Sequence, residues 1–310
     1  MSVLEKNIKI LKHLRWSLIF FYRNILGRIS AEYLAKKLYR KAFKRKLDLE
    51  NPRTLNEIIN YQKFRTDTSM WVDLSDKYKV REYVEAKGLS DILVRLYGVW
   101  DKVEDIDFDI LPKSFVLKSN NGCATVMIVK DKDKLDIKKT KRVLNKWLKL
   151  RFGYRTAEPH YLEIKPRIIA EELLQPSELD KKQSSSIIDY KWYSFNGKTE
   201  YARVVTDRVV GTHLFNLSVY NFKWEKYSDF TNPKYKNDKQ LLKPQTLDRM
   251  IYIANILSEG IPQVRVDLYE VSGKVYFGEL TFSTGGGYSK DLTSDFDLLL
   301  GDMVDRSLMK

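Results

Sequence analysis

Apolar and polar residues alternate most regularly between residues 263 and 282. The alternation continues on both sides of Ser272-Gly273, a residue pair typical of tight turns. A period of two on each side of a turn predicts a β-hairpin with one face in the core and one polar face. The apolar positions of this predicted hairpin are Val264, Val266, Leu268, Tyr276, Leu280 and Phe282.

The charged positions of the hairpin indicate its register. A loop with an odd number of residues, as in three-residue hairpins that end in a left-handed glycine, places Asp267 opposite Glu279. An even loop would place Asp267 beside Leu280 and would mix charge into the apolar face. The pattern therefore predicts an odd loop, with two carboxylates on the polar face and Arg265 and Thr281 close to them.

Paired carboxylates are candidate ligands of a metal ion. Two ionised carboxylates on one face repel each other, so a cation between them is favoured. A sparse set of oxygen ligands fits Mg²⁺, which keeps several waters and completes its shell with substrate phosphates. Asp267, Glu279 and Thr281 are therefore candidate metal ligands. The alternative is a solvated strand face on which the acids pair with Arg265 and nearby lysines.

Other segments continue this mixture of helices and hairpins. Helical spacing marks residues 1 to about 47 and residues 244–260, and strand patterns surround an Asn196-Gly197 turn. Residues 176–187 are expected to form an exposed linker, and residues 206–243, without a regular period, a long loop. The sequence therefore predicts an α+β protein.

Composition narrows the classes of partner. The chain has 310 residues, a 43% hydrophobic fraction and a net charge of +14, which indicate a folded protein that attracts anions. No groove-reading or RNA-binding motif accompanies the charge, so a nucleic-acid partner is disfavoured. Cys123 is the only cysteine, which excludes an internal disulfide and fits a reducing cytoplasm. The three histidines are scattered and do not form a zinc-binding pattern.

The basic N-terminal segment has two possible arrangements. No secretory signal is evident, and the apolar run from Trp16 to Tyr22 is shorter than the ~20 residues that span a bilayer. In one arrangement this helix lies in a membrane interface, with Trp16, Phe20, Phe21 and Tyr22 inserted and lysines on anionic headgroups. In the other, the helix packs on the body of the protein.

A second candidate site surrounds Lys118. This lysine ends a predicted strand and precedes the small loop Asn120-Asn121-Gly122, whose backbone N–H groups could close over phosphate oxygens. Lys191 is held on an aromatic strand surface with Tyr193 and Phe195. Asn-Gly turns and strand-end lysines are common, so the alternative for Lys118 is an ordinary solvated lysine.

Taken in order, these features resemble one known family. A lysine before a small-residue loop, Glu171-Glu172 at a strand end, Lys191, Asp267 and Glu279 follow each other as in the ATP-grasp superfamily. The chain is most similar to the TupA-like ATP-grasp proteins of bacterial capsule and teichuronopeptide synthesis, over roughly residues 52 to 305. The stretches that carry the resemblance are LNEIINY, LSDKYKVREYV, YGVWD, DIDFDILPKSFVLKSNNG, KPRIIAEELL, DYKWYSFNGK and VRVDLYEVSGKVYFGELTF.

The resemblance implies an ATP-grasp fold, in which two α+β lobes clamp a nucleotide, preceded by a helical N-terminal extension. The implied boundaries are residues 1–50 for the extension, 51–112 for the N-terminal part, 113–175 for the first lobe and 176–310 for the second lobe.

The resemblance also implies a binding site for ATP and Mg²⁺. Lys118 would contact the α- and β-phosphates, Asn120, Asn121 and Gly122 would cover the triphosphate, and Glu171 and Glu172 would meet the adenine and ribose. Lys77 and Lys191 would contact phosphates, and Asp267 and Glu279 would hold Mg²⁺. Two departures concern the metal and the loop: Thr281 stands where many family members have asparagine, and the loop after Lys118 has no multi-glycine run.

The implied reaction is carboxylate activation, in which ATP phosphorylates a carboxyl group and an amine displaces the phosphate to form an amide. Arg265 would hold the acyl phosphate or the substrate carboxylate, and Lys191 would stabilise the transferring phosphoryl group. The alternative for Arg265 is a salt bridge to Glu279. The expected partners are an acidic glycan or lipid-linked sugar acceptor, an amino acid or other amine, and an anionic membrane, with the protein in the cytoplasm or peripheral at the inner membrane surface. A glycosyltransferase or glycan kinase of the same pathway, and a non-catalytic basic binding protein, are the alternatives.

Overall fold

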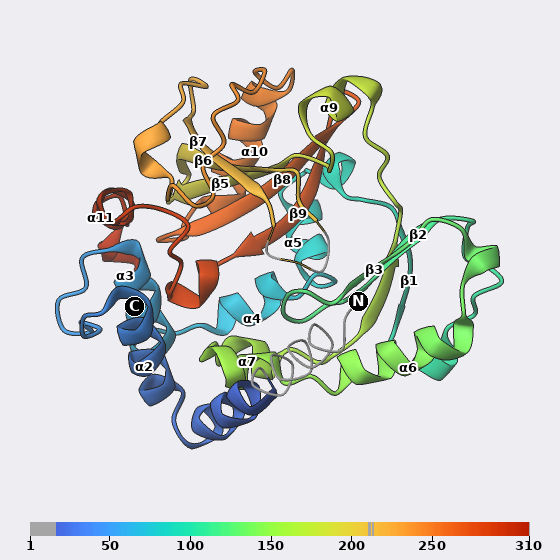
Figure 1. Ribbon diagram of the computed structural model, residues 1–310, viewed down its shortest axis with the longest axis horizontal. Coiled ribbons are helices and arrows are strands. Elements are labelled where there is room, and N and C mark those ends of the chain that lie inside the picture. The colour runs from blue at the N-terminus through green and yellow to red at the C-terminus, as the bar shows by residue number, and fades with distance from the viewer. Residues whose placement is uncertain (1–16, 210–211, 213, 310) are drawn as a thin grey trace, which may run out of the picture.

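Two antiparallel sheets form the centre of the fold, and the computed structural model describes residues 17–209, 212 and 214–309 (Figure 1). The first sheet has the strand order β1-β4-β2-β3, and the second has the order β7-β6-β5-β8-β9. The strands are β1 (Leu96–Trp100), β2 (Phe115–Ser119), β3 (Val126–Val129), β4 (Ile168–Glu171), β5 (Asp189–Phe195), β6 (Lys198–Thr206), β7 (Asn216–Asn221), β8 (Val264–Val271) and β9 (Lys274–Thr281).

Helices surround both sheets, so the predicted α+β class is confirmed. They are residues 17–29, α2 (Ala31–Phe43), α3 (Leu55–Arg65), α4 (Ser69–Ser75), α5 (Val80–Ala86), α6 (Ile137–Leu148), α7 (Phe152–Thr156), α8 (His160–Glu163), α9 (Glu178–Gln183), α10 (Leu247–Ser258) and α11 (Ser294–Asp302). Within the described ranges, no helix has the length and apolar character that crossing a membrane requires.

The first lobe consists of the first sheet with α6 on one face. Leu144 of α6 belongs to the same buried cluster as Phe115 and Leu117 of β2. Residues on the other face of β2, such as Lys118, point away from this cluster because side chains alternate along a strand. β1 comes from the segment that was predicted to precede the first lobe, yet it pairs with β4.

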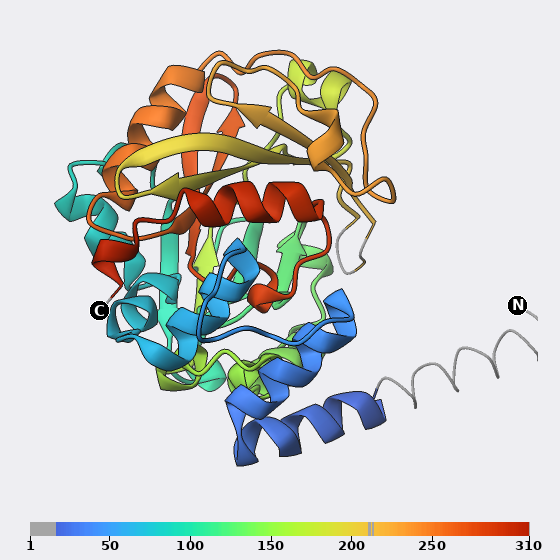
Figure 2. The same ribbon diagram turned by 90° about the vertical axis from the view of Figure 1, so that its left-hand side faces the viewer.

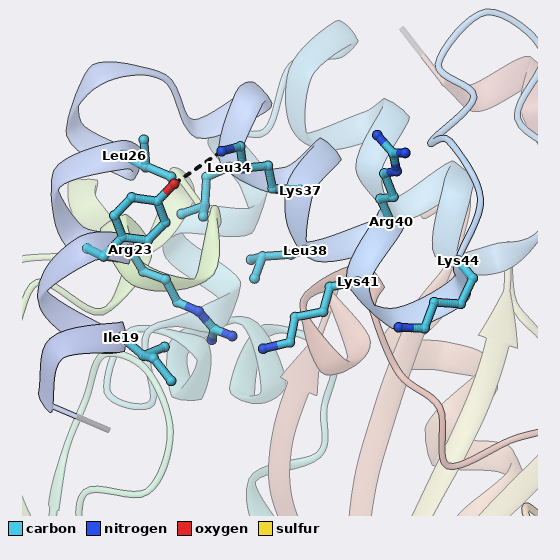
Figure 3. A pocket seen from close by; sticks show the side chains of 10 residues that line it. Ile19, Arg23, Leu26, Leu34, Lys37, Leu38, Arg40, Lys41 and Lys44 are labelled. Atoms are coloured by element: carbon cyan, nitrogen blue, oxygen red, sulfur yellow. Dashed lines mark hydrogen bonds between the residues drawn. The ribbon is translucent and has the colours of Figure 1, made fainter. Parts of the chain in front are cut away.

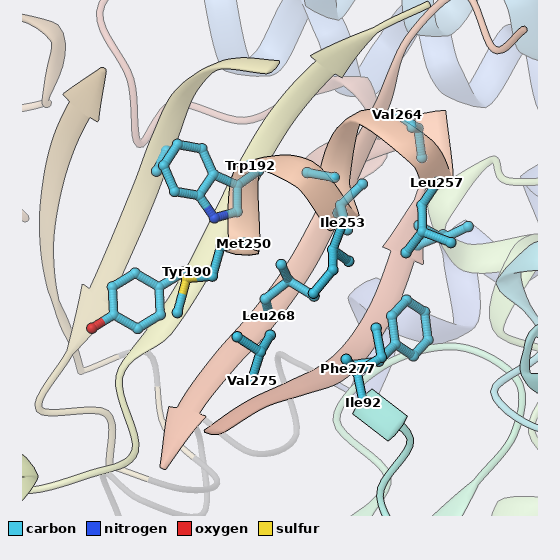
Figure 4. Close-up of a cluster of buried hydrophobic side chains, with 14 of the residues drawn as sticks. Ile92, Tyr190, Trp192, Met250, Ile253, Leu257, Val264, Leu268, Val275 and Phe277 are labelled. Carbon is cyan, nitrogen blue, oxygen red and sulfur yellow. The ribbon is translucent and has the colours of Figure 1, made fainter. Parts of the chain in front are cut away.

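The second lobe consists of the second sheet with α10 on one face. Met250, Ile253 and Leu257 of α10 pack against Trp192 of β5 and Leu268 of β8 in the largest buried cluster (Figure 4). The opposite face of the sheet meets other elements. At one end it meets α3 and α11, as Figure 2 shows, and this contact leaves the centre of the face free for polar side chains.

The β8–β9 hairpin has a two-residue loop, so the predicted odd loop is wrong. Val271 pairs with Lys274, and Ser272 and Gly273 between them have φ angles of 54° and 72°, as a type I′ turn requires. Asp267 nevertheless pairs with Glu279, because the register shifts by one residue between Asp267 and Leu268.

Gly278 is the extra residue that causes this shift. It lies between Phe277, which pairs with Leu268, and Glu279, and it forms a β-bulge. A Cβ at Gly278 would lie 3.0 Å from the backbone oxygen of Asp267, so glycine suits this position. The bulge also exchanges the faces near the turn: Phe277, rather than the predicted Tyr276, is in the core.

The β5–β6 hairpin has the same two features, a two-residue turn with positive φ angles and a β-bulge. Its turn is the predicted Asn196-Gly197 pair, with φ angles of 45° and 78°. The register then shifts between Tyr193 and Ser194, which leaves Glu200 as the extra residue. In both hairpins, therefore, a bulge changes which side chains face each other near the middle of the sheet.

Two segments that were predicted to be irregular contain regular structure. β7 lies within residues 206–243 and adds an edge strand to the second sheet. α9 lies within residues 176–187, where the Ser177 side chain accepts a hydrogen bond from the Asp180 N–H in a capping box. A capping box between Thr54 and Glu57 also begins α3.

Candidate active site

A row of four charged side chains crosses the face of the second sheet opposite α10, and three of the four are buried. Lys191 of β5 pairs in register with Arg203 of β6 on one side and with Asp267 of β8 on the other. Asp267 in turn pairs with Glu279 of β9. Trp192, the neighbour of Lys191, points to the opposite face and packs in the α10 core. The row therefore sets two cations beside two carboxylates on the face away from α10.

Asp267 is the most enclosed member of the row, with an exposed fraction of 1%. Arg265 Nε donates to its Oδ1 over 2.6 Å and Nη2 donates to Oδ2 over 2.8 Å, and Lys191 Nζ also donates to Oδ2. Burial alone would raise the pKa of Asp267, but the Arg265 and Lys191 charges hold that pKa below its usual value. Asp267 is therefore ionised, and it orients both cations.

Arg265 is held on several sides. Besides its two bonds to Asp267, it donates from Nη2 to Thr281 Oγ1 over 3.0 Å and from Nη1 to Thr284 Oγ1 over 3.5 Å. A guanidinium has five N–H groups, so these contacts leave one N–H without an acceptor among the described residues. Arg265 therefore retains limited capacity to bind a further oxygen.

Glu279 is more accessible than Asp267, with 37% of its side chain exposed. Thr281 Oγ1 donates to Glu279 Oε1 over 3.2 Å, and Lys77 Nζ lies 3.6 Å from Oε2. Glu279 is thus the carboxylate of the pair that has room to bind an additional ion.

The oxygens of Asp267, Glu279 and Thr281 fit Mg²⁺, provided that a nucleotide supplies further ligands. All three donors are oxygen, as a hard cation requires. Asp267 already accepts three hydrogen bonds, and since a carboxylate has about four acceptor positions, one remains. The described residues contain no group of three or more Asp, Glu, His or Cys side chains that could hold a metal ion by themselves. The set therefore suits an ion that arrives with phosphate oxygens.

Lys77 connects this carboxylate to the loop of the first lobe. Its Nζ donates to the backbone oxygen of Gly122 over 2.7 Å while it also faces Glu279. Gly122 has a φ of +80°, and a Cβ there would lie 2.8 Å from the Phe152 ring, so only glycine fits. The backbone N–H groups of residues 121–124 have no acceptor among the described residues. This loop therefore offers free donors next to a lysine, as a phosphate site requires.

Asn120 and Asn121 differ in their surroundings. The Asn120 side chain donates to the Lys165 backbone oxygen over 2.9 Å and accepts from the Arg167 N–H over 2.7 Å. Its amide group therefore fastens the loop to the chain before β4. The backbone oxygen of Asn121 accepts a hydrogen bond from Ser119 Oγ, and this bond does not involve the Asn121 side chain.

Lys118 and Glu171 form a second group in the first lobe. Lys118 Nζ lies 2.6 Å from Glu171 Oε2, and Arg81 Nη1 lies 3.7 Å from Oε1. Glu171 is buried, whereas Glu172 is exposed and contributes its N–H to the backbone oxygen of Arg95. Side-chain contacts thus form two groups of predicted residues, one around Lys118 and Glu171 and one around Asp267.

Sequence reasoning missed Arg203. Its Nη2 lies 2.5 Å from Asp291 Oδ2, and its Nε is buried without an acceptor in the described chain. Two other buried polar atoms beside Lys191 also have no partner in the described chain, Asp189 Oδ1 and the Tyr193 hydroxyl. Arg203 was hidden because an unbulged hairpin would have put Ala202 opposite Lys191.

A second buried group lies beneath the glycine-rich turn η5 (Thr284–Gly287), which follows β9. Lys63 Nζ donates to the Gly286 backbone oxygen over 2.8 Å and to the Tyr288 hydroxyl over 3.1 Å. Ser283 Oγ donates to Glu158 over 2.5 Å. Burial lowers the pKa of Lys63 to about 7 and raises the pKa of Glu158. These contacts fix the turn that follows β9.

His160 gives the protein a predictable sensitivity to acid. It is 2% exposed beside Trp71, its two ring nitrogens have no partner in the described chain, and burial lowers its pKa to about 3. The unfolded histidine has a pKa near 6.5, so between pH 6.5 and pH 3 the unfolded state binds more protons than the folded state. The free energy of unfolding therefore decreases as the pH is lowered. We expect this residue to remove about 2 kcal/mol of unfolding free energy between pH 7 and pH 5.

Urea unfolding at both pH values tests this expectation. His160→Phe keeps an aromatic ring at the site but cannot titrate, so its unfolding free energy should fall less between pH 7 and pH 5 than that of the wild type. Equal pH dependence in the two proteins would show that His160 does not titrate as we expect.

Solved structures with a similar fold are ligases by name. D-alanine–D-alanine ligase from Bacillus anthracis has 16% identity and a TM-score of 0.43, with 76% of this chain and 67% of that chain covered. PsnB, an ATP-grasp ligase solved with Mg, ADP and a variant of its minimal precursor, has 10% identity and a TM-score of 0.43, with 83% and 67% covered. Phosphoribosylamine–glycine ligase from Thermotoga maritima has 12% identity and a TM-score of 0.38, with 68% and 48% covered.

The match to a family is more direct. No curated protein matches the chain. The sequence model described as TupA-like ATPgrasp matches residues 57–305, which include every residue of the charged row, the loop after Lys118 and the Lys118–Glu171 pair. The resemblance stated from the sequence motifs is confirmed over nearly the same range. The chain therefore belongs to the TupA-like ATP-grasp family.

Proposed function

We propose that the protein is an ATP- and Mg²⁺-dependent carboxylate–amine ligase that modifies a bacterial surface polysaccharide. In this proposal ATP phosphorylates the carboxyl group of a uronic-acid residue, and an amino acid or other amine then attacks the acyl carbon. The new C–N bond replaces the C–O bond to phosphate, and ADP, phosphate and a proton are released. Membership of an ATP-grasp family supports the nucleotide and the ligase class.

The observation that carries the proposal is the charged row opposite the loop of residues 121–124. Arg203, Lys191 and Arg265 place positive charge on one face of the second sheet, and Lys77 connects that face to the loop with free N–H groups. Fixed positive charge is what transfer of a phosphoryl group needs, since the reaction requires charge stabilisation more than a nucleophilic side chain. A bound Mg²⁺, held by Glu279, Asp267 and Thr281, would neutralise charge on the phosphate oxygens.

Each part of the chain has a defined task in this proposal. Lys118 and the loop including Asn121 and Gly122 bind the phosphates, Asn120 holds that loop in place, and Glu171 and Glu172 lie at the start of the linker toward the second lobe. Arg265 uses its remaining N–H on the acyl phosphate. The net charge of +14 favours an acidic acceptor, and a uronic acid supplies both negative charge and a carboxyl group.

Product analysis tests this function. The protein is incubated with ATP, Mg²⁺, a uronic-acid glycan and a mixture of amino acids, and the products are examined by mass spectrometry. We expect an amide-linked glycan, with ADP and phosphate released in equal amounts only when both acceptor and amine are present. A phosphorylated glycan would indicate a kinase, and turnover of a nucleotide sugar without ATP would indicate a glycosyltransferase; either outcome contradicts the ligase proposal.

A further inference from the structure

The helix of residues 17–29 exposes a continuous apolar stripe. Leu18, Phe21 and Ile29 are 67–76% exposed, and Ile25 is 42% exposed. Their spacing of three and four residues places them along one side of the helix. We call these four residues the apolar ridge. A soluble helix normally turns such a stripe toward a core, so the ridge needs a partner outside the described chain.

The helix is firmly seated on its other side. Leu26 packs on a buried cluster that includes Leu34 of α2 and Ala157. Gly27 lies against the chain so closely that a Cβ there would be 1.8 Å from the Tyr154 backbone oxygen. The contact of this second side with the body fixes the direction in which the ridge points, away from the protein.

A basic groove lies on each side of the ridge. The first groove, between this helix and α2, has a volume of about 690 Å³ and an apolar floor that includes Leu26, Leu34 and Leu38 (Figure 3). The second, of about 340 Å³, lies against the segment after α6. The cations of the first groove are Arg23, Lys37, Arg40, Lys41 and Lys44, and those of the second are Arg28, Lys149 and Arg151.

These eight cations lack acidic partners in the described chain. Between residues 17 and 47 there are nine Lys or Arg residues and one acid, Glu32, whose ion pairs are with Lys36 and Arg65. Lys37 donates to the Tyr22 hydroxyl instead of to a carboxylate. The grooves therefore surround an apolar ridge with uncompensated positive charge, and this combination selects an anionic and apolar partner.

We propose that the ridge and its two grooves bind the surface of a membrane that contains anionic phospholipid. The ridge enters the boundary between headgroups and acyl chains, and the grooves bind lipid phosphates. A second copy of this chain fits less well, since its eight cations would face the same eight. Residues 1–16 also fit less well as a cover, because they carry four Lys or Arg and one Glu.

The proposal differs in its inserted side chains from the membrane arrangement that the sequence left open. In that arrangement Phe20, Phe21 and Tyr22 insert together, but consecutive residues point about 100° apart around a helix. Only Phe21 of the three belongs to the ridge; Phe20 lies near Arg155, whose guanidinium is 5.2 Å from its ring centre, and Tyr22 lines the first groove. Trp16, which also inserts in that arrangement, lies outside the described residues.

Vesicle sedimentation with the full chain tests the proposal and does not depend on the ligase chemistry. Binding to vesicles with about one-third phosphatidylglycerol should exceed binding to pure phosphatidylcholine about tenfold or more, and should weaken as salt rises from about 0.05 to 0.5 M. The groove variant Arg40→Glu, Lys41→Glu, Lys44→Glu should bind about a hundredfold more weakly. The ridge variant Leu18→Ser, Phe21→Ser, Ile29→Ser should bind at least tenfold more weakly.

A matched variant distinguishes the effect of this surface on vesicle binding from the effect of the protein's net charge. Lys223→Glu, Lys243→Glu, Lys274→Glu makes the same change of charge at exposed positions of the second lobe and should bind within about threefold of the wild type. Equal losses in the two charge-reversed variants, wild-type binding by the ridge variant, or no preference for the anionic vesicles would overturn the proposal. A dimer in sedimentation velocity that the ridge variant dissociates would also overturn it, since the ridge would then bind a second copy. Unchanged circular dichroism and melting temperature show that each variant is folded.

Discussion

Replacing Asp267 by asparagine is expected to lower the free energy of unfolding by about 3–5 kcal/mol. The carboxylate is buried between Arg265 and Lys191, and it accepts hydrogen bonds from both. Asparagine keeps the size of the side chain but removes the negative charge, so two buried cations would lose their common counter-charge. Breaking a buried ion pair from one side is far more costly than losing an exposed pair.

Urea unfolding near neutral pH measures this effect, with Glu279→Gln as the matched substitution on the neighbouring strand. Because Glu279 is partly exposed and its ion-pair distances are 3.6 Å, that variant should change stability by less than about 1 kcal/mol. The double variant Asp267→Asn, Lys191→Met should be less destabilised than the two single changes added together, since it removes one of the two cations that Asp267 neutralises; Lys191 also lies 2.8 Å from Asp189 Oδ2. A single Asp267→Asn variant as stable as Glu279→Gln would contradict our account of the buried cluster.

The pairing of Asp267 with Glu279 shows which features of the hairpin the sequence pattern could predict and which it could not. The pattern correctly indicated that two carboxylates share one face, but the inferred reason, an odd loop, was wrong. A type I′ turn of two residues together with a bulge at Gly278 gives the same pairing. Hydrophobic alternation reports which side chains share a face, whereas a single inserted residue anywhere along the strand can satisfy the same constraint.

The same limitation hid Arg203. The hairpin and its Asn196-Gly197 turn could be predicted, because the turn residues adopt positive φ and the flanking residues alternate. The bulge at Glu200 could not, since no residue type marks it. Pairing across strands depended on that bulge, so the cation beside Lys191 could be found only in the folded sheet.

Asn120 illustrates a different limit. The sequence indicated that backbone N–H groups of residues 120–122 could cover phosphates, and it gave no separate role to the Asn120 side chain. In the structure the Asn120 amide binds the chain at Lys165 and Arg167, whereas the free donors are backbone N–H groups of residues 121–124. These contacts join residues about 45 positions apart, so local sequence carries no signal for them.

The family and the α+β class were predictable because many weak patterns agree over most of the chain. Each stretch, such as the one around Lys118, is unremarkable alone, but the order of several motifs is restrictive. Partners of individual side chains depend on register and on packing between distant segments. The Lys77–Glu279 contact is an example, since it joins the turn between α4 and α5 to the end of the second sheet.

Replacing Glu279 by glutamine is expected to reduce turnover in the proposed ligase reaction about 10²–10³-fold while leaving the fold intact. Glutamine has nearly the same shape and can still accept the hydrogen bond from Thr281, so the local structure should persist. It lacks the charge that an Mg²⁺ ion beside Asp267 requires. The loss should therefore appear in Mg²⁺-dependent steps and not in the stability of the protein.

Nucleotide binding separates this role from a purely structural one and can be measured even before the acceptor is identified. Melting curves with ATP should show a shift that Mg²⁺ enlarges in the wild type, and Glu279→Gln should lose the Mg²⁺-dependent part while keeping the shift seen without the ion. Glu178→Gln is the control, because this acid is 85% exposed on α9, paired only with Lys181 in the described chain, and should behave like the wild type. If Mg²⁺ enlarges the shift equally in Glu279→Gln and in the wild type, Glu279 does not hold the ion, and the assignment of the β8–β9 hairpin as the metal site is wrong.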